Sequence, residues 1–213
     1  MEHLKLFESF NKVDIHEICK EYGIKNYTIN KDGSIDVNGN VNLYHKKLYE
    51  LLLKFNKVNG YFSCLDNMLS TLDGCPKIVG TYYICSFNSL TSLEGCPKTI
   101  NGDFTCESNL LTSLKGCPES IGGNFYCNDN KLTTFEYFPK HLGDVFHCSD
   151  NPIWHIWKLF RDATKIELFN DMDIIQDDVI IFDRLNFFLE EIGRSTVSKI
   201  AIDTFTSAGY KCV

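Results

Sequence analysis

Cysteine offers the widest chemistry of any side chain here, and the 213 residues include ten cysteines. A thiolate can bind zinc, attack an electrophile or form a disulfide. A zinc site needs ligands at short spacings such as Cys-x2-Cys, and the chain contains no such pair. A nucleophilic cysteine needs a partner base, and the sequence places none in register with these cysteines. We therefore expect no metal, no cofactor and no catalytic cysteine.

The remaining titratable residues also argue against an enzyme. His147 and His155 lie on different predicted elements, and no third ligand accompanies them. Glu190 and Glu191 are adjacent, so they would point to different sides of a helix and make a poor acid–base pair. No phosphate-binding Gly-Lys loop is present. The sequence predicts a binding protein with no catalytic residues.

The spacing of the cysteines indicates a structural role instead. Two cysteine columns, an asparagine column and a leucine column all recur every 21 residues, a period typical of solenoids. The main columns are Cys64, Cys85, Cys106, Cys127 and Cys148, and Asn67, Asn88, Asn109, Asn130 and Asn151. The second cysteine column is Cys75, Cys96 and Cys117.

The repeated unit explains why a small apolar side chain is needed at these positions. In "DFTCE", Phe104 and Cys106 alternate with polar residues, which predicts a short strand with one face inward. One turn cannot bury that face alone, but stacked turns can. Free cysteine behaves as a small hydrophobe, so reduced thiols suit the interior columns. The asparagines should form a ladder that satisfies buried backbone groups. The prolines, such as Pro76, should break helix on the return side, the part of each turn that leads back to the next strand, and leave extended or turn backbone there.

The copies run from "FSCLDNMLSTLDGCPKIVGTY" to "FYCNDNKLTTFEYFPKHLGDV", with a degenerate copy from Val41 and a partial one from Phe146. This unit resembles the leucine-rich repeat, in the short cysteine-containing form of bacterial effectors and of small phage-encoded proteins. The resemblance covers residues 41–157. It implies an α+β solenoid with short parallel strands on a concave face. It also implies protein binding, in a bacterial or phage setting.

The two ends of the chain should cover the terminal turns. Residues 1–40 predict an N-terminal helical cap and a hairpin around Asp32-Gly33, with a short helix at Leu4–Phe10 and another from Asp14. Residues 158–213 predict a helical C-terminal cap, following a helix that starts after Pro152. Its longest helix should span 177–193, a third should follow a cap at Ser195, and "YKCV" should be extended.

Charge and hydropathy limit the classes of partner that the chain could bind. The formal net charge is −7, so the chain lacks the excess of Lys and Arg with which nucleic-acid binders contact phosphates. No apolar run approaches the roughly 18 residues that cross a bilayer, and the first residues, "MEHLKLFESFNKVD", carry charges where a secretory signal is apolar. We expect a cytoplasmic protein that binds neither a membrane nor nucleic acid directly.

Outward positions on the strands are the candidate binding surface, because exposed aromatic side chains beside acids often dominate protein interfaces. Strand propensity alone would also explain the aromatic residues. The candidates are Tyr61, Tyr82, Ile84, Phe87, Asp103, Glu107, Tyr126 and His147.

A second candidate surface is acidic. Between Glu167 and Glu191 there are eight acids and one base, Arg184. Such a helical face could bind a basic partner or mimic a nucleic-acid backbone. An ordinary solvated helix face explains the charges equally well.

Overall fold

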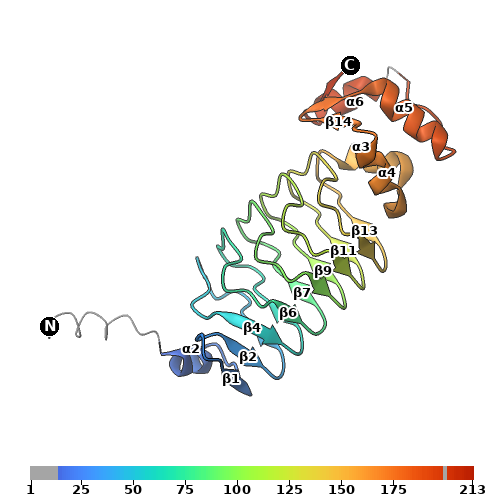
Figure 1. Ribbon diagram of the computed structural model, residues 1–213. Helices are drawn as coiled ribbons and strands as arrows, with labels where there is room; N and C mark the ends of the chain where they lie inside the picture. Colours follow the sequence, from blue (N-terminus) through green and yellow to red (C-terminus); the bar gives the residue numbers. More distant parts are fainter. Residues whose placement is uncertain (1–13, 199–200) are drawn as a thin grey trace, which may run out of the picture.

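The computed structural model describes residues 14–198 and 201–213, and its central part is a β-solenoid of stacked parallel strands (Figure 1). The predicted solenoid is therefore confirmed. The predicted helix at Leu4–Phe10 lies outside the described residues. No described helix is long and apolar enough to cross a bilayer.

The cysteine-containing strands form a six-stranded parallel sheet. Each strand contains two residues, and partners across the sheet are 21 residues apart, such as Phe104 and Phe125. The order is β13-β11-β9-β7-β5-β3. The strands are β3 Val41–Asn42, β5 Phe62–Ser63, β7 Tyr83–Ile84, β9 Phe104–Thr105, β11 Phe125–Tyr126 and β13 Phe146–His147.

The return side of each coil forms a second sheet, which the sequence pattern did not predict as strands. This seven-stranded sheet has the order β1-β2-β4-β6-β8-β10-β12, and only the β1–β2 pair is antiparallel. Its strands are β1 Tyr27–Ile29, β2 Ile35–Val37, β4 Phe55–Val58, β6 Ile78–Val79, β8 Thr99–Ile100, β10 Ser120–Ile121 and β12 His141–Leu142. The coil is therefore a flattened loop with one strand on each side.

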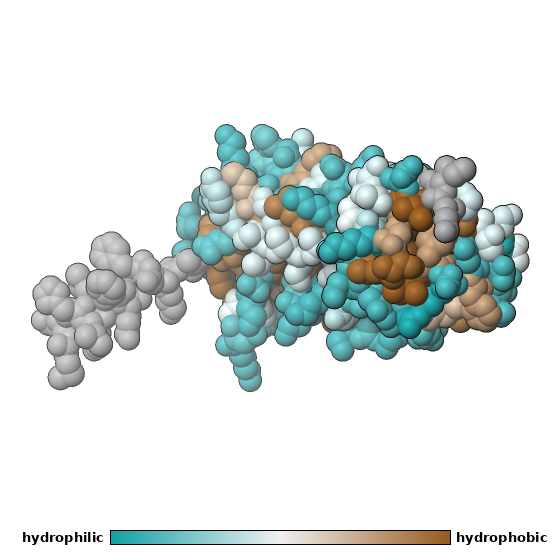
Figure 2. Space-filling view, turned by 90° about the horizontal axis from the view of Figure 1, so that it is seen from above, coloured by the Kyte–Doolittle hydropathy of each residue, from teal (hydrophilic) through white to brown (hydrophobic). Residues whose placement is uncertain are grey.

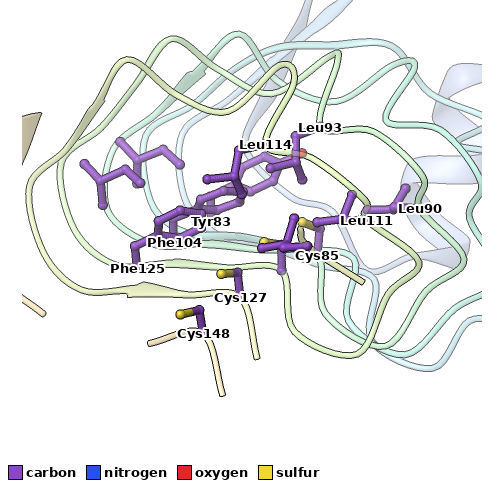
Figure 3. Close-up of a cluster of buried hydrophobic side chains, with 14 of the residues drawn as sticks. Tyr83, Cys85, Leu90, Leu93, Phe104, Leu111, Leu114, Phe125, Cys127 and Cys148 are labelled. Atoms are coloured by element: carbon purple, nitrogen blue, oxygen red, sulfur yellow. The ribbon is translucent and has the colours of Figure 1, made fainter. Parts of the chain in front are cut away.

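Columns of similar side chains, one from each coil, fill the interior between the two sheets (Figure 3). The rings of Phe104 and Phe125 stack with centroids 5.3 Å apart, and those of Phe62 and Tyr83 with centroids 5.6 Å apart. Leu90, Leu111 and the strand cysteines are fully buried beside them. Burying one such aromatic side chain contributes about 1.5–3 kcal/mol, which each coil obtains only from its neighbours.

The asparagine of each coil connects three chain segments. The Asn109 side-chain oxygen accepts a hydrogen bond from the Leu90 backbone N–H at 3.0 Å. Its amide nitrogen donates to the carbonyl oxygens of Cys85 and Cys106, both at 3.1 Å. The same pattern recurs from Asn67 to Asn151, where Asn151 receives the Leu132 N–H at 2.9 Å. Each amide thereby satisfies backbone groups that the turn leaves unpaired in the interior.

The N-terminal segment contains helix α2, Ile15–Glu21, and the β1–β2 hairpin. The Asp14 carboxylate accepts from the His16 backbone N–H at 2.9 Å, so Asp14 is the predicted N-cap. Gly23 follows the helix with a φ of 67°, which suits a helix-ending glycine. The hairpin around Asp32-Gly33 is confirmed, and β2 joins the return-side sheet through β4.

The C-terminal segment is mixed α and β, so the prediction of a helical region is wrong in part. It contains α3 Trp154–Phe160, the 3-10 helix Ala163–Lys165, α4 Ile166–Asp171, β14 Ile175–Gln176, β15 Val179–Ile180, α5 Phe182–Glu191, α6 Ala201–Ser207 and β16 Lys211–Cys212. The helix expected over 177–193 begins only at Phe182, because Val179–Ile180 pair with both β14 and β16. Ser195 lies outside any helix, whereas the predicted extended end is confirmed as β16.

Aromatic contacts join this segment to the last coil. The Trp157 ring on α3 lies edge-on to Phe146, with centroids 5.1 Å apart, and Phe135 contacts Phe169 of α4 at 5.4 Å. Figure 2 shows hydrophobic residues gathered among hydrophilic ones over the C-terminal part of the molecule.

Candidate functional site

The outward face of the six-stranded sheet carries the predicted binding residues. Ile84, Tyr126 and His147 are the second residues of β7, β11 and β13. Tyr82 and Phe87 are the most exposed of the set, at 49% and 55%. The half-buried members are Tyr61, Ile84, Asp103, Glu107, Tyr126 and His147.

The first three coils form an aromatic region of this face. A shallow hollow of about 320 Å³ lies between Tyr44, Tyr61 and Ile84, with Ser63 and Leu65 on its floor. Tyr44 is 53% exposed and was not predicted, because the copy from Val41 lacks the repeat's motif residues. Its alignment with Leu65, 21 residues later, is the signal that could have found it.

Two aromatic side chains of this region are held in defined positions. A Cβ atom on Gly102 would lie 3.0 Å from a ring carbon of Tyr82, so this ring packs directly on the glycine backbone. Phe87 has a φ of 54°, in the left-handed region that bulky residues rarely adopt. The other coils place polar residues in the same left-handed position, namely His45, Asp66, Ser108, Asp129 and Asp150. An aromatic residue here is costly for the fold, which points to a role for the ring on the surface.

The coils that follow present a polar region whose carboxylates are already engaged. The Asp103 carboxylate accepts from the backbone N–H of Asn124 at 2.7 Å. Glu107 accepts from the side-chain amide of Asn128 at 2.5 Å. Both carboxylates therefore align neighbouring coils, and part of their capacity to accept hydrogen bonds is already used.

Tyr126 and His147 form a stacked pair beside this polar region. Their ring centroids are 4.7 Å apart, and the planes differ by only 9°. The pair offers one flat, half-buried aromatic surface with a nitrogen at its end. No described His, Cys, Asp or Glu residues form a group of three that could hold a metal around it or elsewhere.

Two serines that alternation would place outward are buried. Ser63 is 4% and Ser86 is 2% exposed. The Ser86 hydroxyl donates to Thr105 at 3.0 Å and accepts from the Glu107 backbone N–H at 3.1 Å. A small hydroxyl fits beneath its larger neighbours, so the outward face is less continuous than alternation implies.

All ten cysteines are free thiols. Burial raises the pKa of Cys106 and of Cys127 well above the usual range for a thiol. A thiol kept protonated is a poor nucleophile and a poor metal ligand. In the second column, Cys75 is buried whereas Cys96 and Cys117 are only half-buried.

The eight C-terminal acids do not share one helix face. Asp177 and Asp178 lie in the turn between β14 and β15, and Asp173 follows α4. All eight are exposed, and Asp173 pairs with Arg184 at 3.0 Å. The carboxylates on helices α4 and α5 are Glu167, Asp171, Asp183, Glu190 and Glu191.

Comparisons of the chain with protein-family models, with curated proteins and with solved structures found no match.

Proposed function

We propose that this chain is a protein-binding solenoid of the leucine-rich-repeat type, and that its partner binds the outward face of the six-stranded sheet. The observation that carries the proposal is the aromatic region of the first coils, where Tyr44, Tyr82 and Phe87 are each about half exposed, at 53%, 49% and 55%. Rigid aromatic side chains supply large contact area at a low entropic cost, and such residues dominate interface energetics.

The rest of the proposal follows from the repeat pattern. The segments 1–40 and 158–213 act as caps on the terminal coils of the 41–157 repeats, since a solenoid must cover its end faces. From the resemblance to bacterial and phage-encoded repeat proteins, the partner is a protein in a bacterial cytoplasm, which the chain inhibits or modulates. The resemblance alone supports this last step.

The test is affinity capture from bacterial lysate with paired variants. Tyr82→Ser together with Phe87→Ser should weaken recovery of a specific protein at least tenfold, because each substitution removes an exposed aromatic contact. Tyr137→Ser is the matched control: it removes an exposed tyrosine, 58% exposed, from the return side. Equal recovery by the wild type and the double variant would reject this face.

A second candidate function is binding of a basic partner by the C-terminal carboxylates. It is favoured by the exposure of all eight, of which one forms an ion pair among the described residues. Binding through them should compete with duplex DNA for the partner and fall steeply as salt rises. Salt-insensitive capture would exclude this function.

A further inference from the structure

The return side of the solenoid contains a groove that crosses three consecutive coils. It encloses about 550 Å³, a size typical of small-molecule sites. The segments that line it are 54–55, 72–77 and 95–98, which belong to adjacent coils. Neighbouring strands lie about 4.8 Å apart, so the floor extends for about 10 Å across the three coils.

Two glycines in the lining of the groove allow adjacent coils to stack closely. Gly74 and Gly95 have φ values of 86° and 100°, and each chain segment passes directly over the preceding coil. A Cβ atom at either glycine would lie 2.8 Å from a carbonyl oxygen of that coil, from Leu53 and Leu72 respectively. The backbones of adjacent coils are therefore in direct contact at these glycines, and the groove lies among the side chains beside them. Two coils further along from Gly95, Tyr137 replaces the glycine.

The floor of the groove is apolar. Phe55, Leu72, Cys75, Cys96 and Pro97 supply this apolar lining, and Cys96 is the most exposed of them, since the other four are buried. Burial raises the pKa of the Cys96 thiol well above its usual range, so this thiol contributes no negative charge.

The rim of the groove is basic, although the chain as a whole carries a net charge of −7. Lys54, Lys77 and Lys98 surround the opening, with Asp73 as the one acid among its lining residues. Lys54 pairs with Asp32 at 3.2 Å, and Lys98 with Glu119 at 3.5 Å, but both ammonium groups remain largely exposed. Exposed pairs of this kind are weak, so an anion in the groove can compete for these lysines.

We propose that this groove binds a medium-chain amphipathic anion, such as a fatty carboxylate, with its alkyl chain on the floor and its head group among Lys54, Lys77 and Lys98. Only a ligand with both features uses both surfaces: an inorganic anion would leave the floor uncovered, and a neutral alkane would leave the lysines without a counter-charge. This site is on the opposite sheet from the outward face and is independent of the proposed protein binding.

The experiment titrates decanoate into the full chain by calorimetry and by NMR chemical-shift mapping. Decanoate should bind saturably, and the shifts should map to 54–55, 72–77 and 95–98. Lys77→Glu with Lys98→Glu should weaken binding at least tenfold. Lys115→Glu is the matched control, because Lys115 also pairs with a carboxylate on an adjacent coil and does not line the groove. Decyltrimethylammonium, which carries the opposite charge on the same chain, should not bind there.

Several results would overturn the inference. These are the absence of saturable decanoate binding, equal affinity of the double variant and the wild type, and equal binding of the cationic probe. Co-sedimentation with anionic phospholipid vesicles without binding of free decanoate would also overturn it, because the ligand would then be a membrane surface.

Discussion

Tyr83 is the one tyrosine in a column of buried phenylalanines. Its ring is fully buried between those of Phe62 and Phe104. The hydroxyl has no hydrogen-bond partner among the described residues. Leaving a buried polar group unsatisfied costs about 1–3 kcal/mol, so this coil is weaker than its neighbours at that position.

We therefore expect Tyr83→Phe to raise the free energy of unfolding by about 1 kcal/mol, because the ring contacts stay and the orphan hydroxyl is removed. Urea denaturation monitored by circular dichroism measures the change. The reverse substitution, Phe104→Tyr, should destabilise the protein by a similar or larger amount. A destabilised Tyr83→Phe variant would indicate that the hydroxyl is bonded, for example to a buried water.

At Phe87 we expect stability and binding to conflict: a substitution that stabilises the fold should weaken partner binding. Its left-handed backbone costs about 1–2 kcal/mol for a residue that lacks a local hydrogen-bonding side chain. Phe87→Asp copies the residue that three other coils use at this position, Asp66, Asp129 and Asp150. The variant should unfold at higher urea and yet lose partner capture. A variant that is both less stable and fully active would refute this account of the position.

At the scale of elements, the β1–β2 hairpin depends on one carboxylate. The Asp32 side chain accepts from the Ser34 hydroxyl at 2.6 Å and from the Ser34 backbone N–H at 3.1 Å. These hydrogen bonds, with Lys54 nearby, lower the pKa of Asp32 below its usual value. A carboxyl whose pKa is depressed by folding stabilises the protein above its unfolded pKa of about 3.9, and that stabilisation is lost as the pH falls.

Asp32→Asn should thus be less stable than the wild type at pH 7, and the difference should shrink as the pH falls below about 4. Thermal melts at pH 7, 4 and 2.5 measure it. Ser34→Ala should reproduce part of the effect, because the main donor to the carboxylate is removed. A stability difference that does not change with pH would contradict this role of Asp32.

The elements differ in how far the sequence predicts them, and the reason is the range of the interactions that form them. The solenoid, the hairpin and α3 follow from local signals: the 21-residue period, Asp32-Gly33 and Pro152. Strand β15 was read as helix, because its pairing with Lys211–Cys212 joins segments some thirty residues apart. The return-side strands β6, β8, β10 and β12 contain two residues each, too few to show an alternating pattern.

The outward face could be predicted only in part, because alternation is a local signal and the contacts between coils are not. Alternation places Tyr82 and Ile84 correctly, but it cannot show that Ser86 is covered by Thr105. The lysine-rimmed groove was not predicted at all. Lys77 and Lys98 share a repeat position, whereas Lys54 aligns with Cys75, so only the stacked coils bring the three together.

For the whole molecule, the organisation is one-dimensional, because among the described residues the hydrogen bonds between coils join only neighbouring coils. Strand β9, for example, pairs with β7 and β11, and the side chains of Asn109 and Asn130 join its coil to the same two neighbours. The stability of such a chain is the sum of coil and interface terms. Removing one whole coil should therefore leave two compatible surfaces in contact.

Deletion of residues 104–124 removes 21 residues and joins Asp103 to Phe125, which restores the aromatic-x-Cys motif. We expect this variant to fold, with β7 pairing directly with β11 and with a melting temperature lowered by several degrees. Circular dichroism and size-exclusion chromatography measure both properties.

The control deletes residues 104–125, one more, and so leaves Asp103 directly before Tyr126 and Cys127. Without Phe125 the aromatic-x-Cys spacing is lost, so stacking Cys127 beneath Cys85 would put Asp103 at the inward position beneath the buried ring of Tyr83. This variant should lose cooperative unfolding. If the two deletions behaved alike, the 21-residue register would not be what holds the coils together, because adjacent coils would then be stacking without matching their interior columns.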